Sequence, residues 1–510
     1  MAKRQAKHSA NSIPRMVFVG LSLLFQIGWM LLLILKLNAY SVWISLMTSI
    51  LSAIAVLRLY SRQTTAAMKM PWIMLIMAFP VMGLSLYLLI VVFGDTGMTG
   101  KRIRSNGENL NGILRIPESI PEDIEVNCAG QHNYLLQNTK APVYRNTDVH
   151  FYAEATDAFK VLKEDLEKAE SFIFMEYFIV SDGSAFREIR EILERKAKQG
   201  VDVRLMYDDV GSIGYANFRF ARELTQAGIR CQVFNPALPF LNLFMNHRDH
   251  RKITVIDGKV GFTGGYNLAD EYFDRTRPFG KWKDTGLRLE GEAVRSLTAS
   301  FLEMWQASSR KEEDVAGFLN VCCSIAESQG NVQPYRDNPL SGERAAENVF
   351  LNMAGNAADH LWFTTPYLII TDELNRALGL AAKRGVDVRI VMPGIPDKKM
   401  IYSVTRSYYA GLASQGVRLY EYTPGFIHAK QCVCDGKIAS VGTSNLDYRS
   451  LYLHYENNVL FSGCEAVKQV EQDFETLFAV SREVTEQYRT GRKAIPKIWQ
   501  CILRLFAPMM

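Results

Sequence analysis

Two histidines of this chain begin the same long pattern of polar and small residues. The first pattern begins at His250 and the second at His428, and in each the histidine is followed by Lys, Asp, Gly and Asn at +2, +7, +14 and +17. The members are His250, Lys252, Asp257, Gly264 and Asn267, and then His428, Lys430, Asp435, Gly442 and Asn445. The chain has only eight histidines. Two of them in one repeated pattern therefore indicate a functional site rather than two buried core side chains.

The spacing within each pattern predicts how its side chains are presented. Residues two apart on a strand point to the same face, so His250 and Lys252 should project together, as should His428 and Lys430. The Asp-Gly pair that follows is typical of a hairpin turn, which favours a structural role for Asp257 and Asp435 within a motif that otherwise carries chemistry. The glycines at the end of the returning strand allow a close backbone approach.

Each copy thus presents one imidazole, one ammonium and one amide, a set that suits an anionic phosphoryl group. Displacement at a phosphodiester needs a nucleophile on one side and an acid for the leaving oxygen on the other. Two copies facing each other supply both: a neutral imidazole attacks to give a phosphohistidine, and a protonated imidazole donates to the leaving group. Lys252, Lys430, Asn267 and Asn445 would stabilise the non-bridging oxygens. This chemistry needs no metal, and we expect no cofactor.

The elements around these patterns also occur twice. From about residue 149, strand-like and helix-like segments alternate, as in an α/β layer fold. Residues 196–204 resemble 381–389, and 227–230 resemble 415–418, at offsets of 185 and 188; the two histidines are 178 apart. The sequence therefore predicts two duplicated α/β halves related by a pseudo-twofold axis, with the seam near 310–345.

The N-terminal part has a different composition. Residues 16–35, 37–57 and 70–94 are three apolar runs, each close to the 20 residues that span a bilayer. They predict a membrane anchor, with three transmembrane helices the favoured count. Basic residues flank several of the runs, so they do not decide on which side of the membrane the remainder of the chain lies. Residues 495–510 fit an interfacial amphipathic tail or a packed terminal helix equally well.

These features divide the 510 residues into five parts. We predict an anchor at 1–94, a linker at 95–147, one half at 148–330, the other at 331–485 and an amphipathic tail at 486–510. The formal net charge of +5 is mild and does not demand a nucleic-acid partner. An anchor beside the site instead favours membrane lipid as the substrate.

Several stretches identify the chain as resembling the phospholipase D superfamily, and within it the bacterial cardiolipin synthases. They are the two patterns in residues 246–272 and 422–430, together with 281–286, 407–409 and 442–453, and the resemblance extends over nearly all of the chain from about residue 70. It implies a duplicated phospholipase D-like fold and a reaction in which two phosphatidylglycerols give cardiolipin and glycerol. It also implies a multi-pass protein of the bacterial plasma membrane, with phosphatidylglycerol and membrane lipid as partners.

The resemblance further implies roles for individual residues. A carboxylate should orient each histidine, with Asp284 expected for His250 and Glu456 for His428. By analogy His250 is the nucleophile and His428 the acid, an assignment that the pseudo-symmetry leaves reversible. The chain departs from the expected pattern at Gly286, where a histidine is expected, at His454, where an asparagine is expected, and in a minor way at Thr443.

Three alternatives stay open at this stage. The enzyme could be a phospholipase D-type hydrolase, or a phosphatidyltransferase that uses another alcohol. A non-catalytic protein that binds anionic lipid at a decayed site is less consistent with intact His, Lys and Asn in both copies. The sequence leaves the oligomeric state and the acyl preference open.

Overall fold

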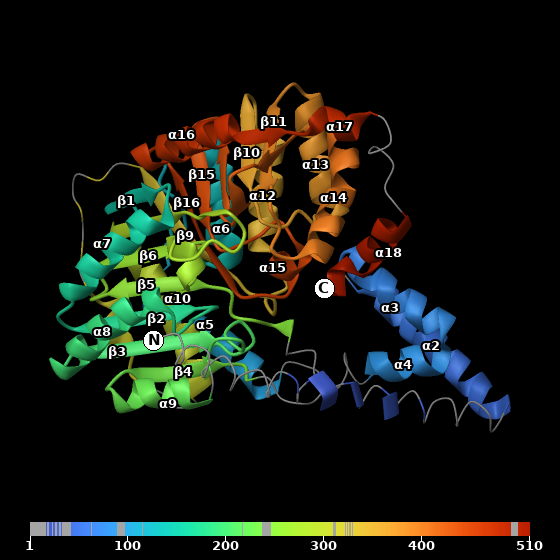
Figure 1. The fold of residues 1–510 in the computed structure, drawn as a ribbon, viewed down its shortest axis with the longest axis horizontal. Helices are drawn as coiled ribbons and strands as arrows, with labels where there is room; N and C mark the ends of the chain where they lie inside the picture. Colours follow the sequence, from blue (N-terminus) through green and yellow to red (C-terminus); the bar gives the residue numbers. More distant parts are fainter. Residues whose placement is uncertain are drawn as a thin grey trace.

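The computed structural model describes most of the chain (Figure 1). The described residues are scattered positions between 17 and 32, then 42–62, 64–88, 97–114, 116–216, 218–236, 246–309, 313–321, 323, 325, 328, 330–490 and 498–509. Two large β-sheets and a two-stranded sheet, with helices packed around them, make up the described α/β part, and helices α2–α4 near the N-terminus extend to one side (Figure 1).

The first half is built on a seven-stranded sheet. Its strands are β1 (Thr147–Tyr152), β2 (Phe172–Tyr177), β3 (Asp202–Asp208), β4 (Arg230–Phe234), β5 (Lys252–Ile256), β6 (Val260–Gly264) and β8 (Gly286–Gly291). They lie in the order β1-β8-β6-β5-β2-β3-β4. The central strand β2 pairs with β3 in parallel and with β5 in antiparallel orientation.

The second half repeats this arrangement. Its strands are β9 (Asn331–Asp337), β10 (His360–Thr364), β11 (Asp387–Pro393), β12 (Arg418–Tyr422), β14 (Gln431–Cys434), β15 (Ile438–Gly442), β16 (Glu456–Ser462) and β17 (Ser481–Glu483). Read from β9, the order is β9-β16-β15-β14-β10-β11-β12, with β17 added at the edge. This is the order of the first sheet, strand for strand, and it confirms the predicted duplication.

Helices cover the outer faces of both sheets, and a shared core joins the halves. The helices of the α/β part are α7 (Ala155–Glu167), α8 (Ser184–Lys198), α9 (Phe218–Gln226), α10 (Val294–Ser309), α11 (Ala316–Leu319), α12 (Ala345–Asn356), α13 (Asp372–Lys383), α14 (Lys399–Ser414), α15 (Tyr448–Tyr452), α16 (Glu465–Val480) and α17 (Thr485–Arg489), with a 3₁₀ turn η3 (Asp270–Phe273). Buried apolar residues from both sheets, such as Phe174, Val255, Val433 and Phe461, belong to one continuous core. Burial of this shared surface fixes the halves against each other.

The region for which the sequence predicts a linker contains two packed helices. Helix α5 (Gly97–Leu114) packs along α10, and α6 (Val126–Thr139) packs against α12. Ile103 and Leu110 of α5 and Leu135 of α6 are fully buried. The linker prediction for 95–147 is therefore wrong in this respect. The polar, glycine- and asparagine-rich composition of α5 hides the few apolar positions that dock it.

The N-terminal part contains three described helices, α2 (Val42–Ser61), α3 (Ala66–Ala78) and α4 (Pro80–Tyr87). Most of the predicted span 16–35 lies outside the described residues. The run 70–94 is not one helix, because the chain breaks at Phe79 before Pro80 and α4 packs back against α3. A Cβ on Gly83 would lie 2.6 Å from the Ile76 Cα, so only glycine permits this approach. Among the residues that the structure describes, no helix combines the length and the apolar character needed to cross a membrane.

The two motif aspartates lie at hairpin turns, and their carboxylates bind the backbone at the beginning of a neighbouring strand, β2 or β10. Asp257 and Asp435 have φ values of 52° and 53°, the left-handed conformation that a short polar side chain tolerates. The Asp257 carboxylate accepts the backbone N–H groups of residues 170–172 at 2.7–2.8 Å. Asp435 accepts those of residues 358–360 at 2.8–2.9 Å. This geometry agrees with the structural role that the Asp-Gly pattern favours and not with a catalytic one, because both carboxylates are occupied in fixing β2 and β10 beside the motif strands.

We predict that Asp257→Ala lowers the free energy of unfolding by about 1–3 kcal/mol, because three backbone donors lose a charged acceptor. Asp257→Asn, which keeps one acceptor oxygen and tolerates a positive φ, should cost less. Chemical denaturation of the detergent-solubilised protein measures both. Unchanged stability in Asp257→Ala, combined with loss of the reaction in folded protein, would contradict the structural role.

Candidate active site

One cavity of about 990 Å³ brings the two halves' patterns together. Its wall includes His250 and Asn267 from the first half and His428 and Asn445 from the second. These residues are far apart in sequence, and the facing of the two patterns is as predicted. The volume lies at the upper end of the range for ligand pockets, large enough for a substrate bigger than a simple phosphate ester.

Each histidine is held through its backbone by the opposite half. The His250 N–H donates to the Tyr455 carbonyl at 2.9 Å, and the His428 N–H donates to the Lys283 carbonyl at 2.7 Å. The second bond continues a short parallel ladder between β7 (Lys281–Lys283) and β13 (Gly425–Ile427). The chain before each histidine therefore pairs with the segment before the other half's carboxylate.

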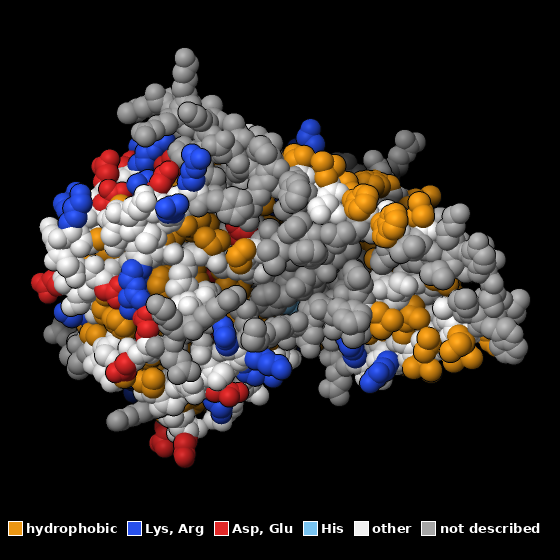
Figure 2. All heavy atoms as spheres, turned by 90° about the horizontal axis from the view of Figure 1, so that it is seen from below, with side chains coloured by type: hydrophobic (Ala, Val, Ile, Leu, Met, Phe, Trp, Pro, Cys, Tyr) orange, Lys and Arg blue, Asp and Glu red, His pale blue; other side chains and the backbone are white. Residues whose placement is uncertain are grey.

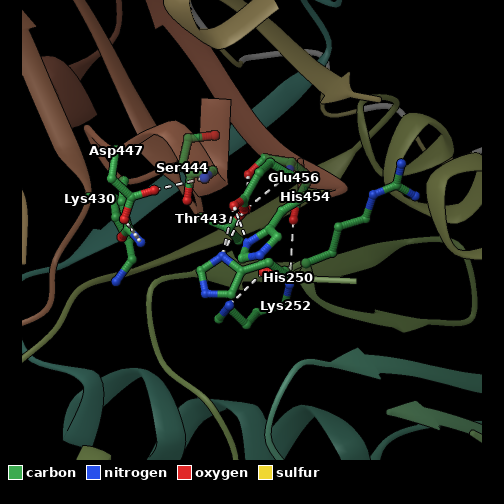
Figure 3. Close-up of polar contacts among 12 residues, drawn as sticks. His250, Lys252, Lys430, Thr443, Ser444, Asp447, His454 and Glu456 are labelled. Carbon is green, nitrogen blue, oxygen red and sulfur yellow. Dashed lines mark hydrogen bonds and ion pairs between the residues drawn. The ribbon is translucent and has the colours of Figure 1, made fainter. Parts of the chain in front are cut away.

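Because of this pairing between the halves, each histidine is held by a carboxylate from the opposite half. His250 Nδ1 lies 2.9 Å from both Glu456 oxygens, and His428 Nδ1 lies 2.7 Å from Asp284 Oδ2. The predicted carboxylates are the right ones, but their predicted partners are wrong. Asp284 belongs to His428 and Glu456 to His250, because each carboxylate directly follows the segment that pairs with the other half's histidine (Figure 3 shows the His250 pair).

Small residues in the pattern make room for the Asp284 carboxylate in one half and for the Asn458 amide in the other. A Cβ on Gly265 would lie 2.0 Å from Asp284 Oδ1, and one on Gly442 would lie 2.3 Å from Asn458 Oδ1. In the second half the residue that matches Gly265 is Thr443, whose hydroxyl donates to Glu456 (Figure 3). The predicted close approach at these glycines is thus confirmed, and the Thr443 departure supplies a hydrogen bond that its counterpart lacks.

The two lysines lie beside their own histidines, as the two-residue spacing predicts. Lys252 Nζ donates to the His250 carbonyl at 2.5 Å, and Lys430 Nζ donates to the His428 carbonyl and lies 2.7 Å from His428 Nδ1. Both ammonium groups are buried. A buried ammonium next to a cavity wall is a strong partner for an anionic ligand.

Burial also shifts the protonation of the site. Desolvation, followed by the nearby lysine charge, holds the pKa of His250 well below its usual value and lowers the pKa of His428 to about 4. Desolvation lowers the pKa of Lys252 to about 8 and that of Lys430 to about 7. In the free site, both imidazoles are therefore neutral near neutral pH, and one of them is ready to act as a nucleophile.

The asparagines of the patterns have side-chain partners of their own. Asn267 Oδ1 accepts the Ile179 N–H at 3.0 Å while its Nδ2 donates to the Tyr272 hydroxyl at 2.8 Å. Asn445 Nδ2 donates to Asp447 at 3.4 Å. Each amide nitrogen has a second N–H and each residue lines the cavity, so phosphate binding by Asn267 and Asn445 stays a prediction.

The two larger departures from the expected pattern have different consequences. Gly286 is not among the residues that line the cavity, and a Cβ there would come within 2.7 Å of Tyr266, so the core disfavours a larger residue. His454 instead lines the cavity, with its ring centroid 5.3 Å from that of His250. Its Nδ1 lies 3.7 Å from Glu456 Oε1, and neither ring nitrogen has a hydrogen-bond partner among the described residues (Figure 3). His454 is thus a third imidazole available to a ligand.

Aromatic residues that the pattern does not predict complete the walls. The Phe178 ring lies edge-on to His250 at 4.9 Å between centroids, and Tyr272 and Trp282 lie 5.3 and 5.6 Å from His428. Trp282 falls in a stretch of family resemblance, whereas Phe178 directly follows β2 and carries no local signal of its role. These rings keep the imidazoles in fixed orientations and out of water.

One group among the described residues has a composition that could hold a metal ion. Ligand atoms of His250, His454 and Glu456 lie within 4.8 Å of one another. Glu456 already accepts from His250 Nδ1, so an imidazole–carboxylate pair accounts for much of this proximity.

The fold and the site together define a phospholipase D-like enzyme: duplicated α/β halves that each contribute one histidine and one asparagine to a common cavity, with a buried lysine beside each histidine. Comparison with known proteins agrees. Residues 162–305 and 350–478 match the family described as "Cardiolipin synthase, PLD-like domain", and residues 49–90 match "Phospholipase_D-nuclease N-terminal".

Whole-chain relatives identify the particular family. A "Cardiolipin synthase" of Halalkalibacterium halodurans is 33% identical over 500 residues, covering 95% of each chain. An "Uncharacterized protein" of Streptococcus mutans is 39% identical over 461 residues, covering 89% of this chain and 99% of that protein. A solved phosphatidylserine synthase of Haemophilus influenzae shares the fold, with a TM-score of 0.54 and 14% identity over 73% of this chain and 96% of that one. The chain belongs to the bacterial cardiolipin synthase family of the phospholipase D superfamily, and is a phosphatidyltransferase.

We predict that the fall of kcat/KM for phosphatidyl transfer with rising pH becomes steeper above about pH 7 to 8, because the ammonium forms of Lys430 and Lys252 are lost there in the free enzyme. A bound phosphodiester stabilises both ammonium groups, so the alkaline limb of kcat should lie at higher pH. Mixed-micelle kinetics on phosphatidylglycerol from pH 5.5 to 9.5 measure both limbs.

Lys430→Arg serves as the diagnostic variant, since a guanidinium stays charged throughout this range. It should lower the rate at pH 7 but move the kcat/KM limb upward, with Lys252→Arg as the matched variant in the other half. An alkaline limb that neither substitution moves would show that another group controls it.

Proposed function

We propose that this enzyme transfers a phosphatidyl group from one phosphatidylglycerol to another, giving cardiolipin and glycerol through a phosphohistidine. The observation that carries the proposal is the pair of buried imidazoles in one cavity, each with its Nδ1 held by a carboxylate of the opposite half. A carboxylate at Nδ1 leaves Nε2 of each ring as the reacting nitrogen and stabilises the imidazolium when it forms.

In the first step, neutral His250 Nε2 attacks the phosphorus. The P–N bond forms, the P–O bond to glycerol breaks, and protonated His428 gives its proton to the leaving oxygen. His428 is neutral in the empty cavity, but the phosphodiester anion favours its protonated form and so couples proton uptake to substrate binding. Lys252 and Lys430 neutralise the non-bridging oxygens.

In the second step, the terminal hydroxyl of another phosphatidylglycerol attacks the phosphohistidine. His428, now neutral, takes the hydroxyl proton, the P–N bond to His250 breaks, and cardiolipin leaves. The roles of the two histidines are assigned by family analogy, and the pseudo-symmetric site could equally run with them reversed.

The cavity walls and the N-terminal helices support a lipid substrate. Aromatic and aliphatic side chains line much of the cavity, including Phe178, Phe279 and Ile401. Exposed apolar side chains also cover α2 and α3. We therefore propose that the enzyme works at the bacterial plasma membrane, and the predicted multi-pass anchor belongs to this proposal.

The test is a product assay with phosphatidylglycerol labelled separately in its head group and its acyl chains. We expect equal amounts of released glycerol and a four-chain product. Glycerol release with phosphatidic acid and no four-chain product would show a hydrolase, and product formed only after adding another alcohol would show a different transferase.

We expect His250→Ala and His428→Ala each to lower transfer by at least about 10³-fold while the protein stays folded, because each step needs both imidazoles. His360→Ala is a matched control, since this histidine contacts Asp359 and Glu471 outside the cavity. Near-normal cardiolipin yield in both site variants would refute the proposal.

A further inference from the structure

Helix α18 (Ile498–Phe506) is docked with Leu503 and two polar side chains on its inner side. It packs against α14 and α3 (Figure 1). On the inner side, the Gln500 amide donates to the Ser403 carbonyl at 3.2 Å and the Arg504 guanidinium lies 3.9 Å from the centre of the Tyr408 ring.

The outer side of α18 is apolar. Ile498 is 82% exposed, Ile502 is 52% exposed, and Trp499 and Phe506 are also exposed. Spacings of one, four and eight residues place these four side chains on one face of the helix. A terminal helix that only completes a water-soluble core turns this face inward, so α18 presents its apolar face to something other than water.

The neighbouring helices extend this apolar surface. Their exposed large apolar residues are Leu46, Met47, Ile50, Leu51, Ile54 and Leu57 on α2, and Met70, Met74 and Met77 on α3, with Phe79 beyond it. Figure 2 shows hydrophobic side chains gathered on the side of the molecule that carries α2–α4, whereas most charged side chains lie on the opposite side. The first acidic residue of the chain is Asp95, so Arg58, Arg62 and Lys69 give this end a purely basic character.

The apolar surface adjoins the active-site cavity. Ala507 follows α18 directly and lines the cavity, as do Met400 and Ile401 at the start of α14. Met400 is itself half exposed. Phe506 lies on the exposed apolar face of α18, and the next residue, Ala507, lines the active-site cavity.

We propose that α18, together with α3, is a membrane-embedded rim that seats the mouth of the cavity in the bilayer, so that phospholipids enter sideways with their acyl chains still in the hydrocarbon. The partner is a phospholipid bilayer with anionic head groups. The basic, acid-free N-terminal end and an interfacial tryptophan fit such a surface better than they fit a second copy of the chain. This inference rests on the proposed function, which supplies the lipid substrate.

Cys501 offers a direct reporter of this contact. It lies on α18 and is the one exposed cysteine among the described residues. With an environment-sensitive fluorophore on Cys501 of the full-length protein, we expect a blue shift and protection from aqueous iodide in phosphatidylglycerol–phosphatidylcholine vesicles, with Cys501→Ser as the labelling control. A probe on Cys501 that stays fully open to iodide in vesicles would overturn the proposal. So would protection that follows protein concentration in detergent without vesicles, because it would show a second copy.

The functional test compares two forms of one substrate. We expect Ile498→Asp/Ile502→Asp to lose at least tenfold in transfer with phosphatidylglycerol in vesicles, but to lose less than twofold with a short-chain phosphatidylglycerol below its micellar concentration. Val126→Asp/Leu380→Asp is the matched control, with two exposed apolar residues on α6 and α13 replaced. An equal loss of transfer rate with both forms of the substrate, or no loss with vesicles, would overturn the proposal that α18 is a membrane-embedded rim.

The two proposals fail in different ways. If the unmodified enzyme makes no cardiolipin from either form of the substrate, the proposed function fails. The fluorescence of labelled Cys501 in vesicles still decides whether α18 enters the bilayer.

Discussion

The reaction centre depends on an exchange of backbone hydrogen bonds between the two halves. The His250 N–H is bonded to Tyr455 and the His428 N–H to Lys283, and each acceptor directly precedes the carboxylate that holds the bonded histidine. Backbone pairing of this kind fixes direction and register together. A single duplicated pattern thereby becomes one site in which neither half is complete without the other.

In the proposed mechanism, two chemically identical residues in similar surroundings take opposite roles. Both imidazoles are buried beside a lysine, and burial with that charge keeps them neutral in the empty cavity. In the proposed mechanism, an arriving phosphodiester adds negative charge and favours protonation of one imidazole, so the general acid forms only when substrate is bound. The surroundings of the two imidazoles differ locally, because Thr443 donates to Glu456 and His454 lies beside His250.

Much of this follows from the sequence, and the remainder depends on contacts between segments far apart in it. The paired patterns predict the duplicated α/β halves, the common cavity and the turn role of Asp257 because spacing alone dictates them. The partners of Asp284 and Glu456 depend on which half each strand joins, which no local spacing encodes. The helices within 95–147 are missed because they are polar and dock through few residues. The break at Phe79 depends on a close contact between Gly83 and Ile76 that hydropathy does not reveal.

The crossed histidine–carboxylate pairs can be tested by NMR of protein labelled with ¹⁵N at its histidine rings. An imidazole Nδ1–H donated to a carboxylate gives a strongly downfield proton. We predict that Glu456→Gln removes the resonance that is also lost in His250→Ala, and that Asp284→Asn removes the one lost in His428→Ala. If Glu456→Gln instead removes the resonance lost in His428→Ala, each half holds its own histidine and the exchange of strands is wrong.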